Sequence, residues 1–192
     1  MIVILEGPRG TGKTTLCAEL VRRLNDDGLP AEVHKGQRVG DPIEGMLSTL
    51  SEKFSTDRIW VVDRFHLTEW VMSIHLQRRD FVELTRDIRH IDTLLDQAWA
   101  LGFILEAPDV VLLDRIQQRN DGRGMEMPLS ESRKLWDAAS KLTQFMSVVQ
   151  NGDEIDRQNL LAIMCSHITS RWITSRIQQS AIAILEGPKH GA

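Results

Sequence analysis

The residues with the clearest chemistry lie near the start of the chain, in the segment Gly7-Pro8-Arg9-Gly10-Thr11-Gly12-Lys13-Thr14. This segment fits the pattern G-x-x-x-x-G-K-[ST]. Glycines let the backbone wrap closely and direct its N–H groups at phosphate oxygens, and a following helix adds the positive end of its dipole. We therefore expect a nucleoside triphosphate to be held by Gly7, Arg9, Gly10, Thr11, Gly12, Lys13, Thr14 and Thr15, with Lys13 on the β- and γ-phosphates and the Thr14 hydroxyl on Mg²⁺.

A second polar pair, Asp63-Arg64, follows the apolar segment RIWVV. In open α/β sheets, ligands gather at the carboxyl ends of the strands. Asp63 is therefore placed to hold Mg²⁺ through water or to take a proton from an acceptor hydroxyl, and Arg64 to bind acceptor phosphate through its guanidinium fork. The alternative is a salt bridge at the end of a strand.

Three arginines spaced by four residues, Arg115, Arg119 and Arg123, run into the glycine-containing segment NDGRG. A loop of this kind, over about 117–128, is suited to close on the γ-phosphate, supply positive charge to the transition state and exclude water. The alternative is a solvated basic helix face, and Arg115 could instead pair with Asp114 or Asp109.

Alternating apolar strands and amphipathic helices must position these groups. We expect strands at 2–6, 31–35, 58–62, 101–106 and 145–149. We expect helices at 13–25, from Asp41-Pro42, at 66–78 and 80–100, from Pro108-Asp109, from a Ser130 cap, and at 156–178. The pattern predicts one α/β domain over residues 1–192, a three-layer sandwich with a five-stranded parallel sheet and a frayed tail from about 180.

Composition bounds the class of protein. The net charge of −4 and the pI near 5.9 argue against a protein whose main task is to grip nucleic-acid backbone. The two cysteines, Cys17 and Cys165, belong to no metal-binding pattern, and no apolar run approaches the ~20 residues of a membrane helix. We expect a cytoplasmic protein without a membrane partner.

Taken together, these segments resemble the thymidylate kinase and deoxynucleoside kinase group of P-loop kinases, which includes small kinases of bacteriophage type. EGPRGTGKTT at 6–15 is similar to the phosphate loop of that group, and VVDRF at 61–65 to its Asp-Arg strand end. LEAPDVVLLDRIQQRNDGR at 105–123 resembles the segment leading to the thymidylate kinase lid. The resemblance implies ATP and Mg²⁺ as cofactors, catalytic roles for Lys13, Asp63, Arg64, Arg119 and Arg123, and Mg²⁺ near Thr14 and Asp63.

The resemblance also implies a wall for the acceptor base on the helix after the Asp-Arg pair. The candidates are Phe65, His66, Glu69 and Trp70, for which the alternative is ordinary helix packing. Deoxynucleoside kinases usually carry a catalytic glutamate after the second strand, where this chain has His34-Lys35-Gly36-Gln37-Arg38. An ionised monophosphate needs no general base, so this departure favours a monophosphate acceptor, with Lys35 and Arg38 holding its charge.

Three hypotheses follow. The first is a kinase of deoxynucleoside monophosphates. The second keeps the fold but transfers phosphate to a hydroxyl, either of a deoxynucleoside or of a hydroxymethylated base in DNA; DNA would need a basic surface, for which Arg78, Arg79, Arg86 and Arg89 are the candidates. The third is a nucleotide-dependent switch or ATPase, although the Asn-Lys-x-Asp guanine motif is missing. Helices 80–100 and 156–178 pack within the domain or form a homodimer face.

Overall fold

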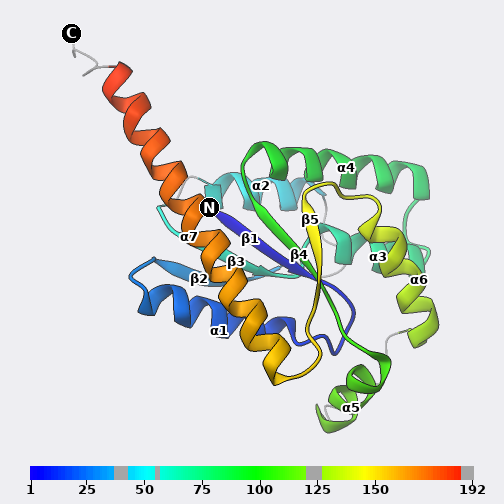
Figure 1. Ribbon diagram of the computed structural model, residues 1–192. Helices are drawn as coiled ribbons and strands as arrows, with labels where there is room; N and C mark the ends of the chain where they lie inside the picture. The colour runs from blue at the N-terminus through cyan, green and yellow to red at the C-terminus, as the bar shows by residue number, and fades with distance from the viewer. Residues whose placement is uncertain (37–42, 55–56, 120–126, 187–192) are drawn as a thin grey trace.

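The computed structural model describes residues 1–36, 43–54, 57–119 and 127–186. Its five strands form one parallel sheet, as the sequence predicts, and their order in the sheet is β2-β3-β1-β4-β5 (Figure 1). The strands are β1 (Ile2–Glu6), β2 (Ala31–Lys35), β3 (Ile59–Asp63), β4 (Leu101–Glu106) and β5 (Met146–Gln150). The helices are α1 (Lys13–Asp26), α2 (Ile43–Phe54), α3 (His66–His75), α4 (Phe81–Gln97), α5 (Asp109–Arg119), α6 (Leu129–Ser140) and α7 (Glu154–Glu186).

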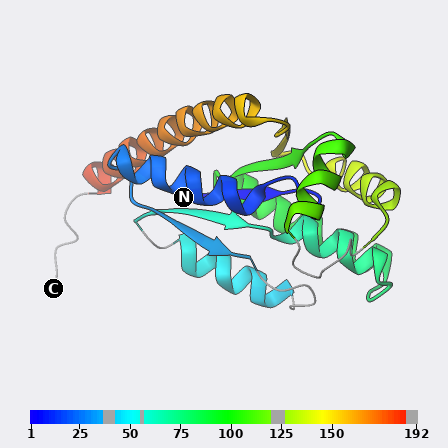
Figure 2. The same ribbon diagram turned by 90° about the horizontal axis from the view of Figure 1, so that it is seen from below.

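Strand β1 lies at the centre of the sheet, and all five of its residues are buried. Successive side chains of a strand point to opposite faces, so β1 contributes to two cores. Val3 and Leu5 pack with apolar residues of α1 and α7, whereas Ile2 and Ile4 pack with residues of α2 and α4. Figure 2 shows the helices on both faces of the sheet, which gives the expected three layers.

The register of the sheet brings the polar strand ends together. Strand β1 pairs with β3 on one side and with β4 on the other, and Leu5 lies opposite Asp63. All three strands run parallel, so their carboxyl ends meet at one edge. The loop after β1 and the Asp63-Arg64 turn after β3 are therefore neighbours, although about fifty residues separate them in the sequence.

Several boundaries differ from the sequence prediction; β3, for example, spans Ile59–Asp63 where 58–62 was expected. The expected Ser130 cap is wrong: Pro128 occupies the N-cap position of α6, and Ser130 lies inside its first turn. The last strand is shifted by one residue. Residues 180–186, where we expected fraying, continue α7 as a helix.

The two long helices bury apolar stripes inside the molecule. Helix α4 buries Leu84, Ile88, Ile91 and Leu95, and α7 packs against α1 through residues such as Leu161. Both helices therefore pack within the domain, and a homodimer face on either of them stays a prediction. Within the described part of the chain, no helix combines the length and the apolar character that crossing a membrane requires.

Strand β1 should dominate stability. Ile4 is 0% exposed, so Ile4→Ala should lower the free energy of unfolding by ~2–5 kcal/mol through lost burial and a cavity. The matched control is Val148→Ala on the edge strand β5, where the side chain is 49% exposed and the change should stay below about 1 kcal/mol. Urea denaturation measures both, and equal losses would contradict the described core.

Candidate active site

The loop after β1 has the backbone that a phosphate cradle needs. Gly7, Gly10 and Gly12 all have positive φ angles, of 129°, 88° and 84°. Residues other than glycine rarely adopt such angles. At Gly7, a Cβ atom would lie only 2.3 Å from the carbonyl oxygen of Leu105 on β4. Glycine is therefore required here by both conformation and space, and the loop passes close over the end of β4.

Lys13 is folded into this loop. Its Nζ donates hydrogen bonds to the carbonyl oxygens of Gly7 and Pro8, both at 2.7 Å, and to Thr11 Oγ1 at 3.2 Å. Burial lowers the pKa of Lys13 to about 7, with a further lowering by the positive charge of Arg64. The loop thus places positive charge in a buried site, where desolvation raises the free energy of the charged form. Negatively charged phosphate oxygens would stabilise that charge.

The Thr14 hydroxyl and the Asp63 carboxylate meet at the start of α1. Thr14 Oγ1 donates to Asp63 Oδ2 at 2.5 Å, and Asp63 Oδ1 is buried without a hydrogen-bond partner among the described residues. A hydroxyl and a carboxylate are oxygen ligands of the kind Mg²⁺ takes together with substrate phosphates. The pair fits such an ion, whereas the described residues contain no cluster of three or more His, Cys, Asp or Glu that could hold a metal by itself.

The Asp63-Arg64 turn has an unusual backbone. Arg64 has a φ angle of 73°, a left-handed conformation that costs free energy in a residue with a side chain. Its N–H donates to the carbonyl oxygen of Leu5 at 3.0 Å, and Gly36 N donates to the carbonyl oxygen of Asp63 at 3.1 Å. The ends of β1 and β2 therefore hold this turn from two sides.

A cavity lies between the phosphate loop, α3 and α6, and we call it the α3–α6 cavity. Two arginines of the site, Arg9 and Arg64, line it together with Gly7, so positive charge faces the loop at its inner end. The rest of the wall is mostly apolar, with two hydroxyl groups. It consists of Thr68, Val71, Met72, Ile116, Met127, Leu129, Ser132 and Trp136.

A second cavity, of about 250 Å³, lies on the α1 side of the phosphate loop, and we call it the β5–α7 cavity. It begins at Gly12 and Thr15, so it adjoins the start of α1. Its other lining residues are polar and come from α5, from the β5–α7 turn and from α7, namely Arg115, Gln118, Asn151 and Arg157. The phosphate loop therefore separates two cavities of different character.

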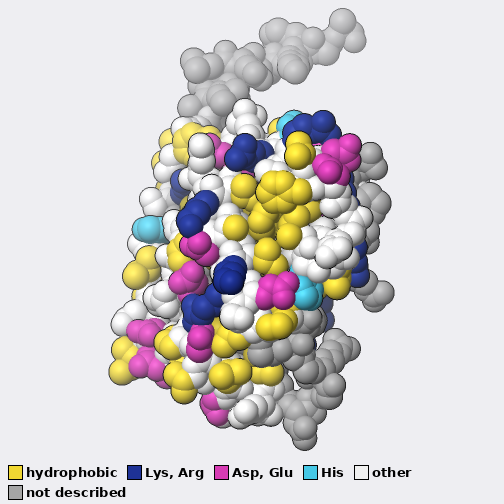
Figure 3. Space-filling model, turned by 90° about the vertical axis from the view of Figure 1, so that its right-hand side faces the viewer, with side chains coloured by type: hydrophobic (Ala, Val, Ile, Leu, Met, Phe, Trp, Pro, Cys, Tyr) yellow, Lys and Arg dark blue, Asp and Glu magenta, His cyan; other side chains and the backbone are white. Residues whose placement is uncertain are grey.

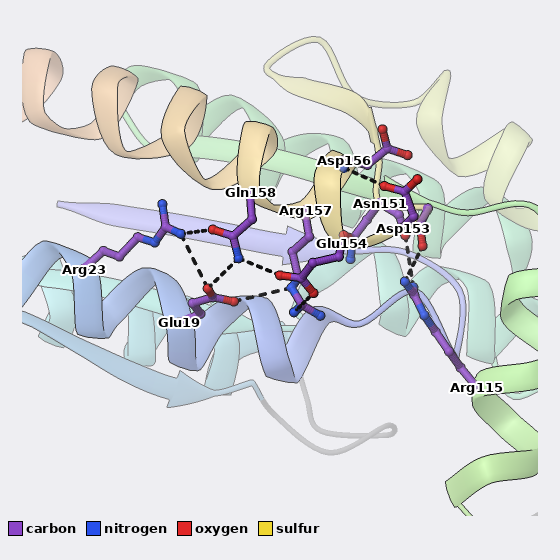
Figure 4. A network of polar contacts seen from close by, with 10 residues as sticks. Glu19, Arg23, Arg115, Asn151, Asp153, Glu154, Asp156, Arg157 and Gln158 are labelled. Carbon is purple, nitrogen blue, oxygen red and sulfur yellow. Dashed lines mark hydrogen bonds and ion pairs between the residues drawn. The ribbon is translucent and has the colours of Figure 1, made fainter.

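Arg115 and Asn151 fasten the phosphate loop to the β5–α7 turn (Figure 4). The Arg115 guanidinium donates to the carbonyl oxygens of Gly10, Asn151 and Gly152, at 3.4, 3.0 and 2.5 Å, and Asn151 Nδ2 donates to the Thr11 carbonyl oxygen at 2.6 Å. Figure 4 also shows α1 and α7 joined by Glu19, Arg23, Arg157 and Gln158. Arg115 thus anchors the phosphate loop to the β5–α7 turn through these carbonyl oxygens.

The aromatic and polar residues expected to form the acceptor wall lie elsewhere. Phe65, His66, Glu69 and Trp70 are all buried, and none of them lines the α3–α6 cavity. His66 contacts Asp92, Glu69 accepts a hydrogen bond from Ser73, and Trp70 Nε1 donates to Thr85. These are contacts of ordinary helix packing, the alternative interpretation, and α3 turns Thr68, Val71 and Met72 to the α3–α6 cavity. A role of the four residues in acceptor binding stays a prediction.

The remaining predicted residues are placed less completely. Lys35 lies at the end of β2, in register with Asp63, and its side chain is exposed. Arg119 ends α5. Arg38, Arg123 and most of the lid segment predicted at 117–128 lie outside the described residues.

Three contributors to the site were missed by the sequence interpretation: Glu6, Asn151 and Trp136. Glu6 and Asn151 carry the same signal that identified Asp63, a polar residue at or just beyond the carboxyl end of a strand. Trp136 carries no such signal, because a tryptophan in an amphipathic helix is expected in the hydrophobic core. Only the positions of the neighbouring helices show that it lines the α3–α6 cavity.

The phosphate loop, the parallel sheet and the flanking helices together form an α/β fold with a phosphate-binding loop after its first strand. Among solved structures, one that this fold matches is polyphosphate kinase 2 from Arthrobacter aurescens TC1, with a TM-score of 0.60 and 13% sequence identity. The match covers 86% of this chain and 64% of that protein, so the chain spans slightly less than two thirds of its length. No protein-family model and no curated protein matches the sequence.

The pKa of Lys13 predicts a pH-dependent stability difference. The folded-state pKa of about 7 lies below the ordinary lysine pKa of 10.5, so the buried ammonium destabilises the protein below pH 7, and stability rises as the pH increases toward 10.5. The unfolding free energy of the wild type should therefore rise relative to that of Lys13→Met by about 1.4 kcal/mol for each pH unit between pH 7 and 10. A pH-independent difference over that range would contradict the lowered pKa.

Because Gly36 packs against the Asp63-Arg64 turn, we expect any residue with a Cβ atom at position 36 to destabilise the protein. A Cβ atom at Gly36 would lie 1.6 Å from the Arg64 carbonyl oxygen, a backbone atom that cannot move aside alone. Gly36→Ala should lower the melting temperature by several degrees. The control is Gly28→Ala, where φ is +77° but no atom lies within 4 Å of a Cβ, so only conformational strain of about 1 kcal/mol is expected. Equal melting temperatures for the two variants would show that β2 does not hold the turn.

Proposed function

We propose that this protein is a phosphotransferase that moves the γ-phosphate of ATP to a nucleoside monophosphate. The observation that carries the proposal is the division of the site by the phosphate loop. Lys13 lies in the loop, the polar β5–α7 cavity adjoins one side, and the α3–α6 cavity with its two arginines adjoins the other. A transferase needs this arrangement, because donor and acceptor must approach one γ-phosphate from opposite sides.

On the donor side, the β5–α7 cavity supports a nucleoside triphosphate. Phosphates in the loop would place the sugar and base next to Gly12 and Thr15, where the cavity has about 250 Å³ and polar walls. The solved neighbour's name refers to polyphosphate, a donor with no base. A polyphosphate chain would leave this cavity without a function, so we favour ATP.

On the acceptor side, the charge of the α3–α6 cavity supports an ionised group. Arg9 and Arg64 line it, and its described lining residues include no carboxylate that could act as a general base. A phosphate monoester is already ionised and needs none. The wall between α3 and α6 is apolar, as contact with the base of the same molecule requires, and the cavity, of about 40 Å³ in this structure, would have to widen to admit the base.

In the proposed reaction, an acceptor phosphate oxygen attacks the γ-phosphorus while the bond from that phosphorus to the β,γ-bridging oxygen breaks. The products are ADP and a nucleoside diphosphate, and no proton has to be removed from the acceptor. Lys13 and the loop N–H groups hold the donor, and Arg9 and Arg64 hold the acceptor and neutralise transition-state charge. Thr14 and Asp63 would hold Mg²⁺, which would supply positive charge to the donor phosphates.

A hydroxyl acceptor is the second candidate, and Asp63 is the observation in its favour. Its buried Oδ1, unpartnered among the described residues, is a carboxylate oxygen that could accept a hydroxyl proton. A DNA-borne hydroxyl finds less support. The surface around α4 mixes both charges with exposed Leu76, Phe81 and Val82, and Arg79 and Arg86 contact Asp87 (Figure 3).

A transfer assay with ATP labelled in the γ-phosphate tests the proposal. The acceptor panel contains nucleoside monophosphates, deoxynucleosides and duplex DNA with hydroxymethylated bases, and inorganic polyphosphate replaces ATP in a parallel set. We expect label in a nucleoside diphosphate, dependent on Mg²⁺. Arg64→Ala should raise the acceptor KM at least about tenfold, because a charge-assisted phosphate contact is lost.

The control variant is Arg78→Ala, at an exposed position outside both cavities, which should leave transfer to a monophosphate unchanged. Label on DNA, sensitive to Arg78→Ala, would replace the proposal with the DNA alternative. Hydrolysis of ATP unaffected by any acceptor would contradict both and indicate a switch or ATPase.

A further inference from the structure

Glu6, the last residue of β1, is a fully buried carboxylate that gathers the start of α3. Its Oε1 accepts hydrogen bonds from the N–H groups of Phe65, Leu67 and Thr68, at 2.9, 3.0 and 3.4 Å, and its Oε2 accepts from the Thr68 hydroxyl. The N-cap residue of α3, Phe65, makes no side-chain cap of its own. Glu6, on β1, therefore accepts hydrogen bonds from the free N–H groups at the N-terminus of α3, where its negative charge also complements the helix dipole.

The same contacts determine the backbone of Arg64. The N–H of Arg64 donates to the Leu5 carbonyl oxygen, and the next N–H, of Phe65, donates to Glu6. Two consecutive residues of β1 thus hold two consecutive amides of the turn. A left-handed φ angle costs about 1–3 kcal/mol in a residue such as Arg64, and it persists only where the surroundings fix it on both sides.

Glu6 therefore connects β1 to the wall of the α3–α6 cavity. Arg64 and Thr68 both line that cavity. Glu6 accepts hydrogen bonds from Thr68 and from residues that lie between Arg64 and Thr68 in the sequence. We propose that Glu6 is a positioning residue whose carboxylate fixes the segment from Arg64 to Thr68, so that Arg64 faces the acceptor beside the phosphate loop. The naming of the ligand as an acceptor rests on the proposed function; the placement of Arg64 by Glu6 does not.

Asp92 offers a matched control. It is also a buried carboxylate, and His66 lies between the two, with Nδ1 4.0 Å from Glu6 Oε1 and Nε2 3.3 Å from Asp92 Oδ1. The other contacts of Asp92 are with the Thr143 hydroxyl at 2.6 Å and the Gln144 N–H at 3.2 Å, in the connection from α6 to β5. Among the described residues, Asp92 reaches the segment 64–68 only through the His66 side chain, so Asp92→Asn removes a buried charge without removing an acceptor of that segment's backbone N–H groups.

The test compares Glu6→Gln with Asp92→Asn in steady-state kinetics and in hydrogen–deuterium exchange. Glutamine keeps the shape of the side chain but loses the charge and one acceptor oxygen. We expect Glu6→Gln to raise the acceptor KM about tenfold, more than it raises the ATP KM, and to lower exchange protection over residues 64–68. Asp92→Asn should lower the melting temperature without either effect.

An acceptor KM that changes equally in the two variants would overturn the inference, as would unchanged exchange protection over 64–68 in Glu6→Gln. If Glu6→Gln does not fold, Glu6→Asp takes its place. Aspartate keeps the charge but is one methylene shorter, and the same rise in acceptor KM is expected. If the wild type transfers no phosphate to any acceptor, the proposed function fails, and exchange over 64–68 alone decides the role of Glu6.

Discussion

Close backbone packing around the carboxyl end of β1 is the constraint on which the site depends. A Cβ atom at Gly7 would collide with the Leu105 carbonyl oxygen, and one at Gly36 with that of Arg64. Glycines at these positions let the phosphate loop pass over β4 and let β2 meet the Arg64 turn. The buried apolar residues of β1 supply the free energy that holds this packing, because they join the cores on both faces of the sheet.

Charge is concentrated at the same place. Burial and the positive charge of Arg64 lower the pKa of Lys13, whereas the negative charges of Asp63 and Glu6 raise it, and the resulting pKa is about 7. Such a site is poorly suited to stability and well suited to anions, since phosphate oxygens bring the negative charge that the buried ammonium lacks. The two cavities on either side of the loop then allow donor and acceptor to reach it.

Much of this could be predicted from the sequence because local signals agree with the fold. The apolar run 2–6, the glycine pattern and the Asp63-Arg64 strand end each predict their own surroundings. The side of α3 that faces the cavity could not be predicted, since all eight residues from His66 to Ser73 are buried and no amphipathic pattern distinguishes them. Its orientation depends on Glu6, which is about sixty residues away. Arg115 was likewise ambiguous, because its partners are carbonyl oxygens, which every residue carries.

The central claim is that the phosphate loop divides a donor cavity from an acceptor cavity. The most direct measurement is a crystal structure of the protein with Mg²⁺, a non-hydrolysable ATP analogue and the preferred acceptor. The account predicts the donor base between Arg115 and Asn151, and the acceptor phosphate against Arg9 and Arg64 with its base toward Trp136. A donor base bound between α3 and α6, or an acceptor bound outside that cavity, would contradict it.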